Sequence, residues 1–154
     1  MAAGFEAASI SGGCQCGAVR YTWSSARLIA YACHCRECQK QTASAFAISV
    51  PARARDLDIS GPLHAYHRST DSGSSTNCWF CATCGTRIYH QSARAPEMVT
   101  LKGGTLDNAA ELEPVAHLWV SRRHRWVQLA PDAEVFETQP EDLKAWRDAL
   151  LGGP

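Results

Sequence analysis

The chain has 154 residues, of which 45% are hydrophobic and 19% charged, and its 15 basic side chains balance 15 acidic ones. This composition is typical of a globular protein, and the length predicts a single domain spanning 1–154. A neutral chain has no general electrostatic attraction for nucleic acid or anionic membrane, so we expect neither as a partner. The longest apolar runs are too short to cross a bilayer and residues 1–10 show no secretory signal, so we expect a cytoplasmic protein.

Most of the predicted elements are short strands. Segments rich in β-branched or aromatic residues are, in chain order, 18–23, 27–33, 44–50, 64–70, 76–80, 86–90, 97–102 and 115–120. We expect a short helix over 35–43 and a hairpin loop over the serine-rich stretch 69–76. The segment 139–153 is the best helix signal, with Pro140 near its start and apolar residues at helical spacing. The sequence therefore predicts a mainly β fold of antiparallel sheets, with short helices and a C-terminal helix.

Eight cysteines are an unusual load for a cytoplasmic protein. Disulfides are disfavoured in that compartment, and cysteines in C-x-C and C-x-x-C pairs lie too close in sequence for relaxed disulfides with each other. Clustered cysteines there indicate metal ligands or redox groups instead.

The cysteines form three clusters. These are Cys14 and Cys16; Cys33, Cys35 and Cys38; and Cys78, Cys81 and Cys84. The stretch 80–86 resembles half of a zinc knuckle, which needs a second pair of thiolates, and the C-x-C pair has no partner of its own. The economical assignment is one structural zinc held by Cys14, Cys16, Cys81 and Cys84, which leaves Cys33, Cys35 and Cys38 as a second zinc site with three thiolates.

The fourth position of this second site decides its role. A protein side chain there would make the zinc structural, whereas water or a substrate would leave it open for chemistry. Cys78 could close the site, or it could be a buried small hydrophobic residue, as free cysteine most often is. His67, His90 and His117 lie in or beside predicted strands, where a structural or substrate-contacting histidine is commoner than a metal ligand.

Five motifs in series carry a resemblance to a known family. The motifs are "GGCQCGAVRY", "CHCRECQKQTASAFA", "FCATCGTRIY", "KGGTLDN" and "HLWVSRRHRWVQL". Over about residues 11–136 they resemble the glutathione-dependent formaldehyde-activating enzyme family, which also includes the centromere protein V group. The resemblance implies an Mss4-like β-tent fold with two zinc ions, the second of which takes the glutathione thiol at its open position. It also implies the conversion of formaldehyde and glutathione to S-hydroxymethylglutathione.

Two positions depart from the family pattern. Ala43 stands where members often have glycine, and Asn108 stands where a second aspartate is common. The chain is also shorter than the formaldehyde enzyme itself.

The chemistry of a three-thiolate zinc site agrees with this resemblance. Such a unit carries a net charge of about minus one by counting ligand charges, and a thiol that coordinates it is deprotonated. The sulfur could then attack a small aldehyde held nearby. Lys40 and the backbone amides of the 33–40 loop are candidates to compensate the charge of a fourth thiolate. The candidate partners for the glutathione carboxylates are Arg53, Arg68, Arg122, Arg123 and Arg125.

Three functions are compatible with these residues. The leading hypothesis is a zinc-dependent carbon–sulfur lyase acting on glutathione adducts of small aldehydes. The alternatives are a non-catalytic interaction module in which both zincs are structural, and a redox or zinc sensor that acts through its thiolates. The basic run 121–125 is interpreted as a solvated turn rather than a nucleic-acid patch, because the chain as a whole is neutral.

Overall fold

The computed structural model describes residues 9–24, 27–70 and 73–153, and it confirms the mainly β architecture. The strands are β1 (Ile10–Gly13), β2 (Arg20–Trp23), β3 (Ala30–Cys33), β4 (Ala47–Arg53), β5 (Leu57–Ser60), β6 (Leu63–Ser69), β7 (Ser75–Cys81), β8 (Arg87–Ser92), β9 (Met98–Lys102), β10 (Pro114–Leu118) and β11 (Glu134–Val135). The helices are α1 (Arg36–Thr42) and α2 (Leu143–Leu150), with short 3-10 turns η1 (Ala54–Asp56), η2 (Gly103–Thr105), η3 (Ala109–Glu111) and η4 (Val120–Arg122). No helix within the described ranges has the length and apolar character needed to cross a membrane.

The strands form two sheets. The smaller has the order β1-β2-β5 and is antiparallel throughout. The larger has the order β11-β10-β3-β4-β9-β8-β7-β6. Its pairs from β3 to β6 are antiparallel as predicted, but β10 lies parallel to both β3 and β11. Parallel neighbours need a long crossover connection, and most of the other strands lie between β3 and β10 in the chain.

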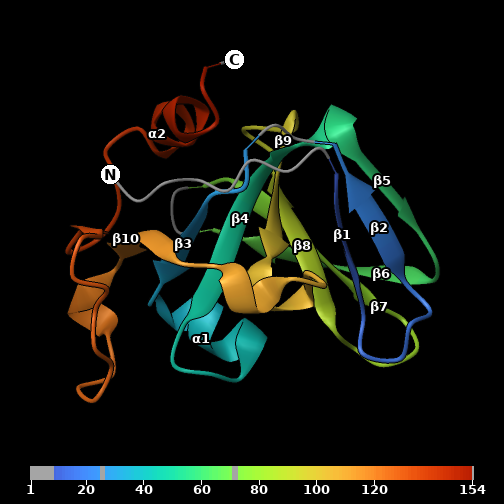
Figure 1. Cartoon of the computed structure of the whole chain (residues 1–154), viewed down its shortest axis with the longest axis horizontal. Helices are drawn as coiled ribbons and strands as arrows, with labels where there is room; N and C mark the ends of the chain where they lie inside the picture. The colour runs from blue at the N-terminus through green and yellow to red at the C-terminus, as the bar shows by residue number, and fades with distance from the viewer. Residues whose placement is uncertain (1–8, 25–26, 71–72, 154) are drawn as a thin grey trace.

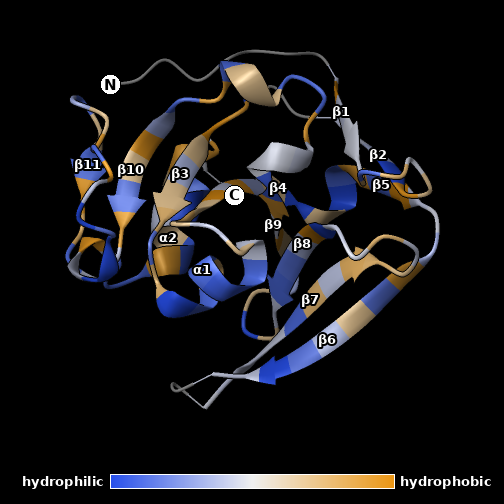
Figure 2. Cartoon of the chain, turned by 90° about the horizontal axis from the view of Figure 1, so that it is seen from below, coloured by the Kyte–Doolittle hydropathy of each residue, from blue (hydrophilic) through white to orange (hydrophobic). Residues whose placement is uncertain are grey.

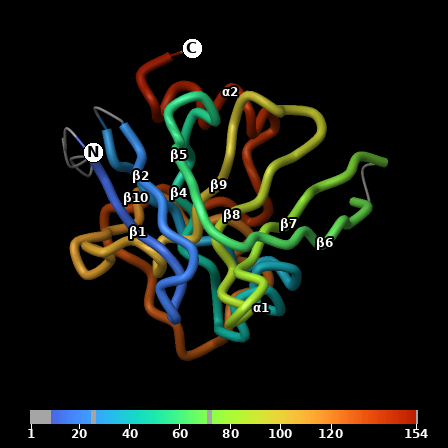
Figure 3. Tube along the Cα trace, turned by 90° about the vertical axis from the view of Figure 1, so that its right-hand side faces the viewer, coloured from blue at the N-terminus to red at the C-terminus, as the bar shows by residue number. Residues whose placement is uncertain are grey.

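The two faces of the larger sheet have different partners, because side chains alternate along each strand. On one face Val50 and Leu101 pack against Tyr21 and Trp23 of the smaller sheet, which together form the main apolar core. On the other face Tyr31 and its neighbours form a second cluster with residues of α1 and α2. Figures 1 and 3 show the two helices towards opposite ends of the strands, and Figure 2 shows the β6–β7 hairpin extending away from them.

Several predicted boundaries shift. The predicted strand over 115–120 ends at Leu118, because Trp119 adopts a left-handed backbone conformation (φ 60°) and opens η4. The C-terminal helix is shorter than 139–153 and begins at Leu143, where the Asp142 carboxylate accepts a hydrogen bond from the amide of Ala145 at 2.9 Å. The predicted hairpin loop joins β6 to β7, although residues 71–72 lie outside the described residues.

Candidate metal centres

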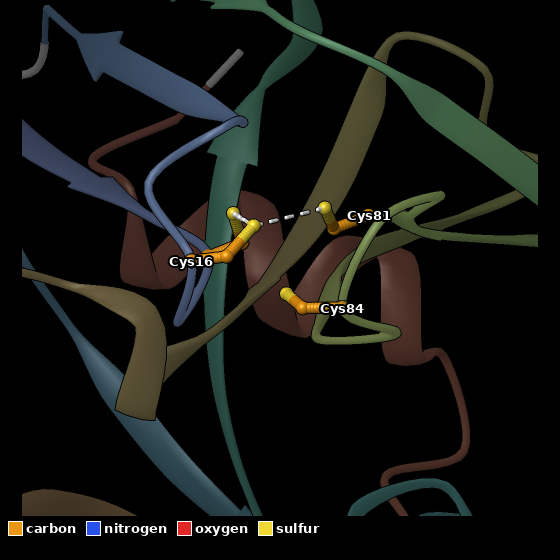
Figure 4. A group of neighbouring side chains, drawn as sticks. Cys16, Cys81 and Cys84 are labelled. Carbon is orange, nitrogen blue, oxygen red and sulfur yellow. Dashed lines mark hydrogen bonds between the residues drawn. The ribbon is translucent and has the colours of Figure 1, made fainter.

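The first cysteine group joins two distant turns of the chain (Figure 4). Cys14 and Cys16 lie in the turn between β1 and β2, and Cys81 and Cys84 lie at the end of β7 and in the turn that follows it. Their four sulfur atoms lie within 4.8 Å of one another. The amide of Val19 donates a hydrogen bond to Cys14 Sγ at 3.2 Å, which fixes one sulfur from the backbone. The sequence assigned these four residues to one site, and the fold brings all four together.

The spacing of these sulfurs fits a tetrahedral zinc ion. The Sγ atoms of Cys14 and Cys16 are 3.5 Å apart, and those of Cys16 and Cys81 are 3.9 Å apart. Zinc–sulfur bonds of about 2.3 Å in a tetrahedron place the sulfurs about 3.8 Å from each other. A disulfide would require about 2.05 Å, and all eight cysteines are free. The donor set and its spacing therefore suit zinc.

The second cysteine group lies where β3 runs into α1. Cys33 ends β3, Cys35 is the N-cap residue of α1 and Cys38 lies in its first turn. Cys35 Sγ accepts a hydrogen bond from the amide of Cys38 at 3.4 Å. The three sulfurs lie within 4.8 Å of one another, and no other His, Cys, Asp or Glu of the described residues joins them. Cys33 and Cys38 are buried, while Cys35 is half-buried and is the member most accessible to solvent.

The three thiols of this group oppose one another's ionisation. Hydrogen bonds from Cys33 and Cys38 lower the pKa of the Cys35 thiol to about 2. The same contact with Cys35, the contact with Cys38 and burial raise the pKa of Cys33 far above its usual range. Three thiols this close cannot all ionise side by side, because like charges disfavour one another. A divalent cation would remove that conflict and allow three thiolates.

A buried lysine that the sequence reading missed lies near this group. Lys102, at the end of β9, is 5% exposed, and its Nζ is 3.1 Å from Nδ1 of His90 on β8. Burial lowers the pKa of Lys102, whereas the thiols of Cys38, Cys78 and Cys33 act in the opposite direction. Desolvation and the neighbouring Lys102 hold the pKa of His90 well below its usual value, so the imidazole is neutral and its Nδ1 can accept a hydrogen bond from the ammonium. The signal in the sequence was a lysine at the end of the apolar run "MVTLK".

Lys40, the cation proposed from the sequence, is exposed on α1. It lines a surface hollow of about 510 Å³ together with Arg36, His124 and Trp126. Lys102, by contrast, is buried on the sheet face that carries Cys33.

A pair of buried histidines, His34 and His117, supports the backbone between Cys33 and Cys35. The amide of Ala130 donates to His117 Nε2 at 3.1 Å, so His117 carries its proton on Nδ1 and donates it to His34 Nε2 at 3.0 Å. Burial lowers the pKa of both imidazoles, which keeps the pair neutral. The expectation that His117 plays a structural part agrees with these bonds.

The remaining predicted residues take separate positions. Cys78 is fully buried on β7 and its sulfur accepts a long hydrogen bond from Gln41, so it stands apart from the three-thiol group. Arg53 is engaged by Asp148 and the carbonyl of Gly153. Residues 121–125 are exposed, as a solvated turn would be. Arg68 lies on β6 near α1, with its Nε 3.9 Å from a carboxylate oxygen of Glu37.

Comparison with known proteins agrees with the motifs. The sequence model of the "Glutathione-dependent formaldehyde-activating enzyme" family matches residues 9–122. The chain belongs to this family. A curated protein from Halomonas elongata, named "Putative glutathione-dependent formaldehyde-activating enzyme", is 27% identical over 151 residues, which cover 93% of this chain and 96% of that protein. A crystal structure of a Rhodobacter sphaeroides protein is 28% identical and covers 68% of this chain and 91% of its own, with a TM-score of 0.50.

The matched region ends before the C-terminal part of the chain. It includes both cysteine groups but stops short of α2. In this chain Arg147 of α2 donates to the hydroxyl of Tyr31 from Nε at 2.9 Å, and Trp146 packs edge-on against the same ring at 5.2 Å. The helix therefore adds a wall to the apolar cluster that contains Cys33 and Cys38.

Proposed function

We propose that this protein is a zinc-dependent carbon–sulfur lyase acting on glutathione adducts of small aldehydes, with formaldehyde and glutathione as the reference pair. The observation that carries the proposal is the three-thiol group, whose sulfurs converge without a fourth protein ligand among the described residues. An open position is what distinguishes a catalytic zinc site from a structural one. Family membership supplies glutathione and formaldehyde as the reactants to test first.

The two cysteine groups would hold two zinc ions with different tasks. Cys14, Cys16, Cys81 and Cys84 offer four ligands and would form a closed structural site. Cys33, Cys35 and Cys38 would hold the second ion, which when bound would favour the thiolate form of an incoming thiol. We place the reaction in the cytoplasm, where thiols remain reduced.

The residues of the chain then supply charge balance and exclusion of water. A fourth thiolate would bring the unit to about minus two, which requires a nearby positive charge. Lys102 is buried on the sheet face that carries Cys33, and it is the cation placed to balance the additional sulfur. The packing of Trp146 and Leu143 against the cluster keeps water from one side of the centre.

The reaction itself is a simple addition and its reverse. The glutathione sulfur forms a bond to the aldehyde carbon while the carbonyl electron pair moves to oxygen. That oxygen then takes up a proton equivalent to the one lost by the thiol, so no oxidant or reductant is needed. Proximity of the two reactants provides the acceleration.

The alternative of a closed, purely structural second site is less well supported. It would need a side chain such as Cys78 or a histidine beside the three thiols, and among the residues that the structure describes none takes that place. Cys78 is instead turned to Gln41 at 3.6 Å.

The decisive experiment is calorimetric titration of the fully zinc-loaded protein with glutathione, beside S-methylglutathione as the blocked-thiol control. We expect binding of glutathione alone, and loss of binding in Cys35→Ser, which leaves the four-cysteine group untouched. Exchange spectroscopy by NMR should then show interconversion of formaldehyde, glutathione and their adduct above the uncatalysed rate. Equal binding of both compounds, or of neither, would rule out an incoming thiol as the fourth ligand.

A further inference from the structure

On α1, β6 and β8, one buried polar atom each makes no hydrogen bond with the described residues. They are Oε1 of Gln41, Nε of Arg68 and Nη1 of Arg87. Buried polar groups are almost always paired, because an unpaired one costs about 1–3 kcal/mol. Unpaired donors and an acceptor gathered between one helix and one sheet face point to a ligand.

The strand register places these atoms around Cys78. Gln41, near the end of α1, donates from Nε2 to the sulfur of Cys78. Cys78 on β7 pairs with Tyr66 on β6 and with His90 on β8. Arg68 follows Tyr66 by two residues, so it extends from the same face of the sheet. Tyr66 is 53% exposed, so this end of the face is open to solvent.

A β-bulge brings Arg87 to this face. Trp79 pairs with Tyr89, but the next residue, Phe80, pairs with Arg87, so one extra residue stands in β8. A regular ladder would send the side chain of Arg87 to the opposite face, because side chains alternate. The bulge re-aims it, and its guanidinium lies 5.9 Å from the centre of the Tyr66 ring and 5.2 Å from that of Phe80.

The chemistry of the cluster is that of an amino-acid recognition site. The two guanidinium groups offer donors with a geometry that matches a carboxylate. Gln41 Oε1 is an acceptor, and the carboxylate of Glu37, 3.9 Å from Arg68 Nε, is another, half-exposed at the edge. Donors and acceptors side by side fit a carboxylate and an ammonium borne on one carbon.

The distance along α1 from Gln41 to the cysteines is one that a small thiol compound can span. Gln41 lies three residues beyond Cys38 and six beyond Cys35, which is about 4.5 Å and 9 Å along the helix axis. In an extended γ-glutamyl-cysteine unit the amino-acid head lies two to three residue lengths from the sulfur, about 7–10 Å. One molecule can therefore reach both places.

We propose that Gln41, Arg68 and Arg87, with Glu37 at the edge, form a head-group site for the α-carboxylate and α-ammonium of a γ-glutamyl thiol whose sulfur enters the three-cysteine centre. This inference rests on the proposed function and adds the part of the substrate that is recognised. It assigns selectivity to the γ-glutamyl end of glutathione rather than to its glycine.

The test compares three thiols by calorimetry on the zinc-loaded protein. Glutathione and γ-glutamylcysteine carry the head group, whereas cysteinylglycine lacks it. We expect the first two to bind within about threefold of each other. Cysteinylglycine should bind about 10- to 150-fold more weakly, as the loss of charge-assisted hydrogen bonds implies.

Single substitutions test which arginines bind the amino-acid head group. Arg87→Gln and Arg68→Gln should each weaken glutathione about tenfold or more and leave cysteinylglycine unchanged. Arg55→Gln, in η1 and with a side chain that is 77% exposed, is the matched control and should bind all three thiols as the unmodified protein does. Arg125→Gln tests the exposed 121–125 turn as the rival partner of the carboxylate. Zinc content and the urea midpoint show that each variant is folded. If Arg87→Gln does not fold, Arg68→Gln alone tests the site. The Arg68 side chain is 25% exposed at the edge of the sheet, so its substitution should disturb folding less.

Other outcomes separate the two proposals. If none of the three thiols binds, the proposed function fails. If all three bind equally, the thiol centre stands and the head-group site is wrong. If Arg125→Gln alone weakens glutathione, the carboxylate is bound by the exposed turn and the head-group site is again wrong.

Discussion

Removal of the Asp148 carboxylate should destabilise the protein strongly, because it leaves a largely buried arginine without its counter-ion. The Arg53 and Asp148 side chains are only 12% and 14% exposed. Breaking a buried ion pair from one side costs about 3–5 kcal/mol. Arg53 keeps a second bond from Nη2 to the carbonyl of Gly153 at 2.7 Å. We therefore expect Asp148→Ala to cost about 3 kcal/mol, equivalent to a fall in Tm of about 6–12 °C.

Urea unfolding of the zinc-loaded protein in the presence of reductant measures this cost. Arg53→Met combined with Asp148→Ala should recover part of the loss, because no unpaired charge remains. Lys144→Met is the control, since Lys144 also bonds Asp148 but is 48% exposed and should matter much less. Because Trp146 of α2 packs on Tyr31, in the apolar cluster that also contains Cys33 and Cys38, Asp148→Ala should also speed alkylation of the metal-free thiols. A loss below about 1 kcal/mol would refute the view that this pair fixes α2.

Four further predictions follow from single positions. Ala43, at the end of α1, has φ 49°, so Ala43→Gly should stabilise the protein by about 0.5–1 kcal/mol in urea unfolding; any loss would contradict this reading. Gly61→Ala should lower the free energy of unfolding by more than about 2 kcal/mol, because φ of Gly61 is 113° and a Cβ there would collide with the carbonyl oxygen of Ala18. Gly17→Ala is the milder control, because the space around Gly17 is open. Arg20 and Ser11 lower the pKa of Asp107 to about 2. The ionised carboxylate therefore contributes its full stabilisation above the unfolded pKa of about 3.9, and this stabilisation is lost as the pH falls to about 2. The difference in urea midpoint between the unmodified protein and Asp107→Asn should shrink over that interval. Cys81→Ser should remove one zinc and unfold the chain, whereas Cys33→Ser should remove the other and leave the β-sheet signal in circular dichroism intact. Equal unfolding of both variants would argue against one structural and one catalytic zinc site.

Much of the fold was accessible from local sequence patterns. Alternation and turn residues located most strands, and the C-x-C and C-x-x-C spacings grouped seven cysteines as the structure does. These signals are local or depend on residue type alone. The short strands "ISGG" and "LDIS" were missed, because "ISGG" has no apolar alternation and that of "LDIS" spans only four residues.

The charged surroundings of the second centre could not be predicted. Lys102 and Arg87 share a sheet face with Cys33 only through the pairing of β3, β4, β9, β8 and β7, and Arg87 depends on a one-residue bulge. Register and bulges arise from tertiary packing, so a run of letters does not reveal them. The left-handed backbone at Ala43 does explain why family members often have glycine at this position, because glycine adopts this conformation without strain.

The four-cysteine site also has a consequence for the unfolded chain. It links sulfurs that are 65 residues apart, from Cys16 to Cys81. A permanent cross-link over such a loop lowers the entropy of the denatured state by an amount worth about 4 kcal/mol. A metal bridge would provide the restraint of a disulfide even where thiols are kept reduced, and it could be withdrawn by chelation. Zinc supply would then set how much of this protein is folded, independently of any substrate.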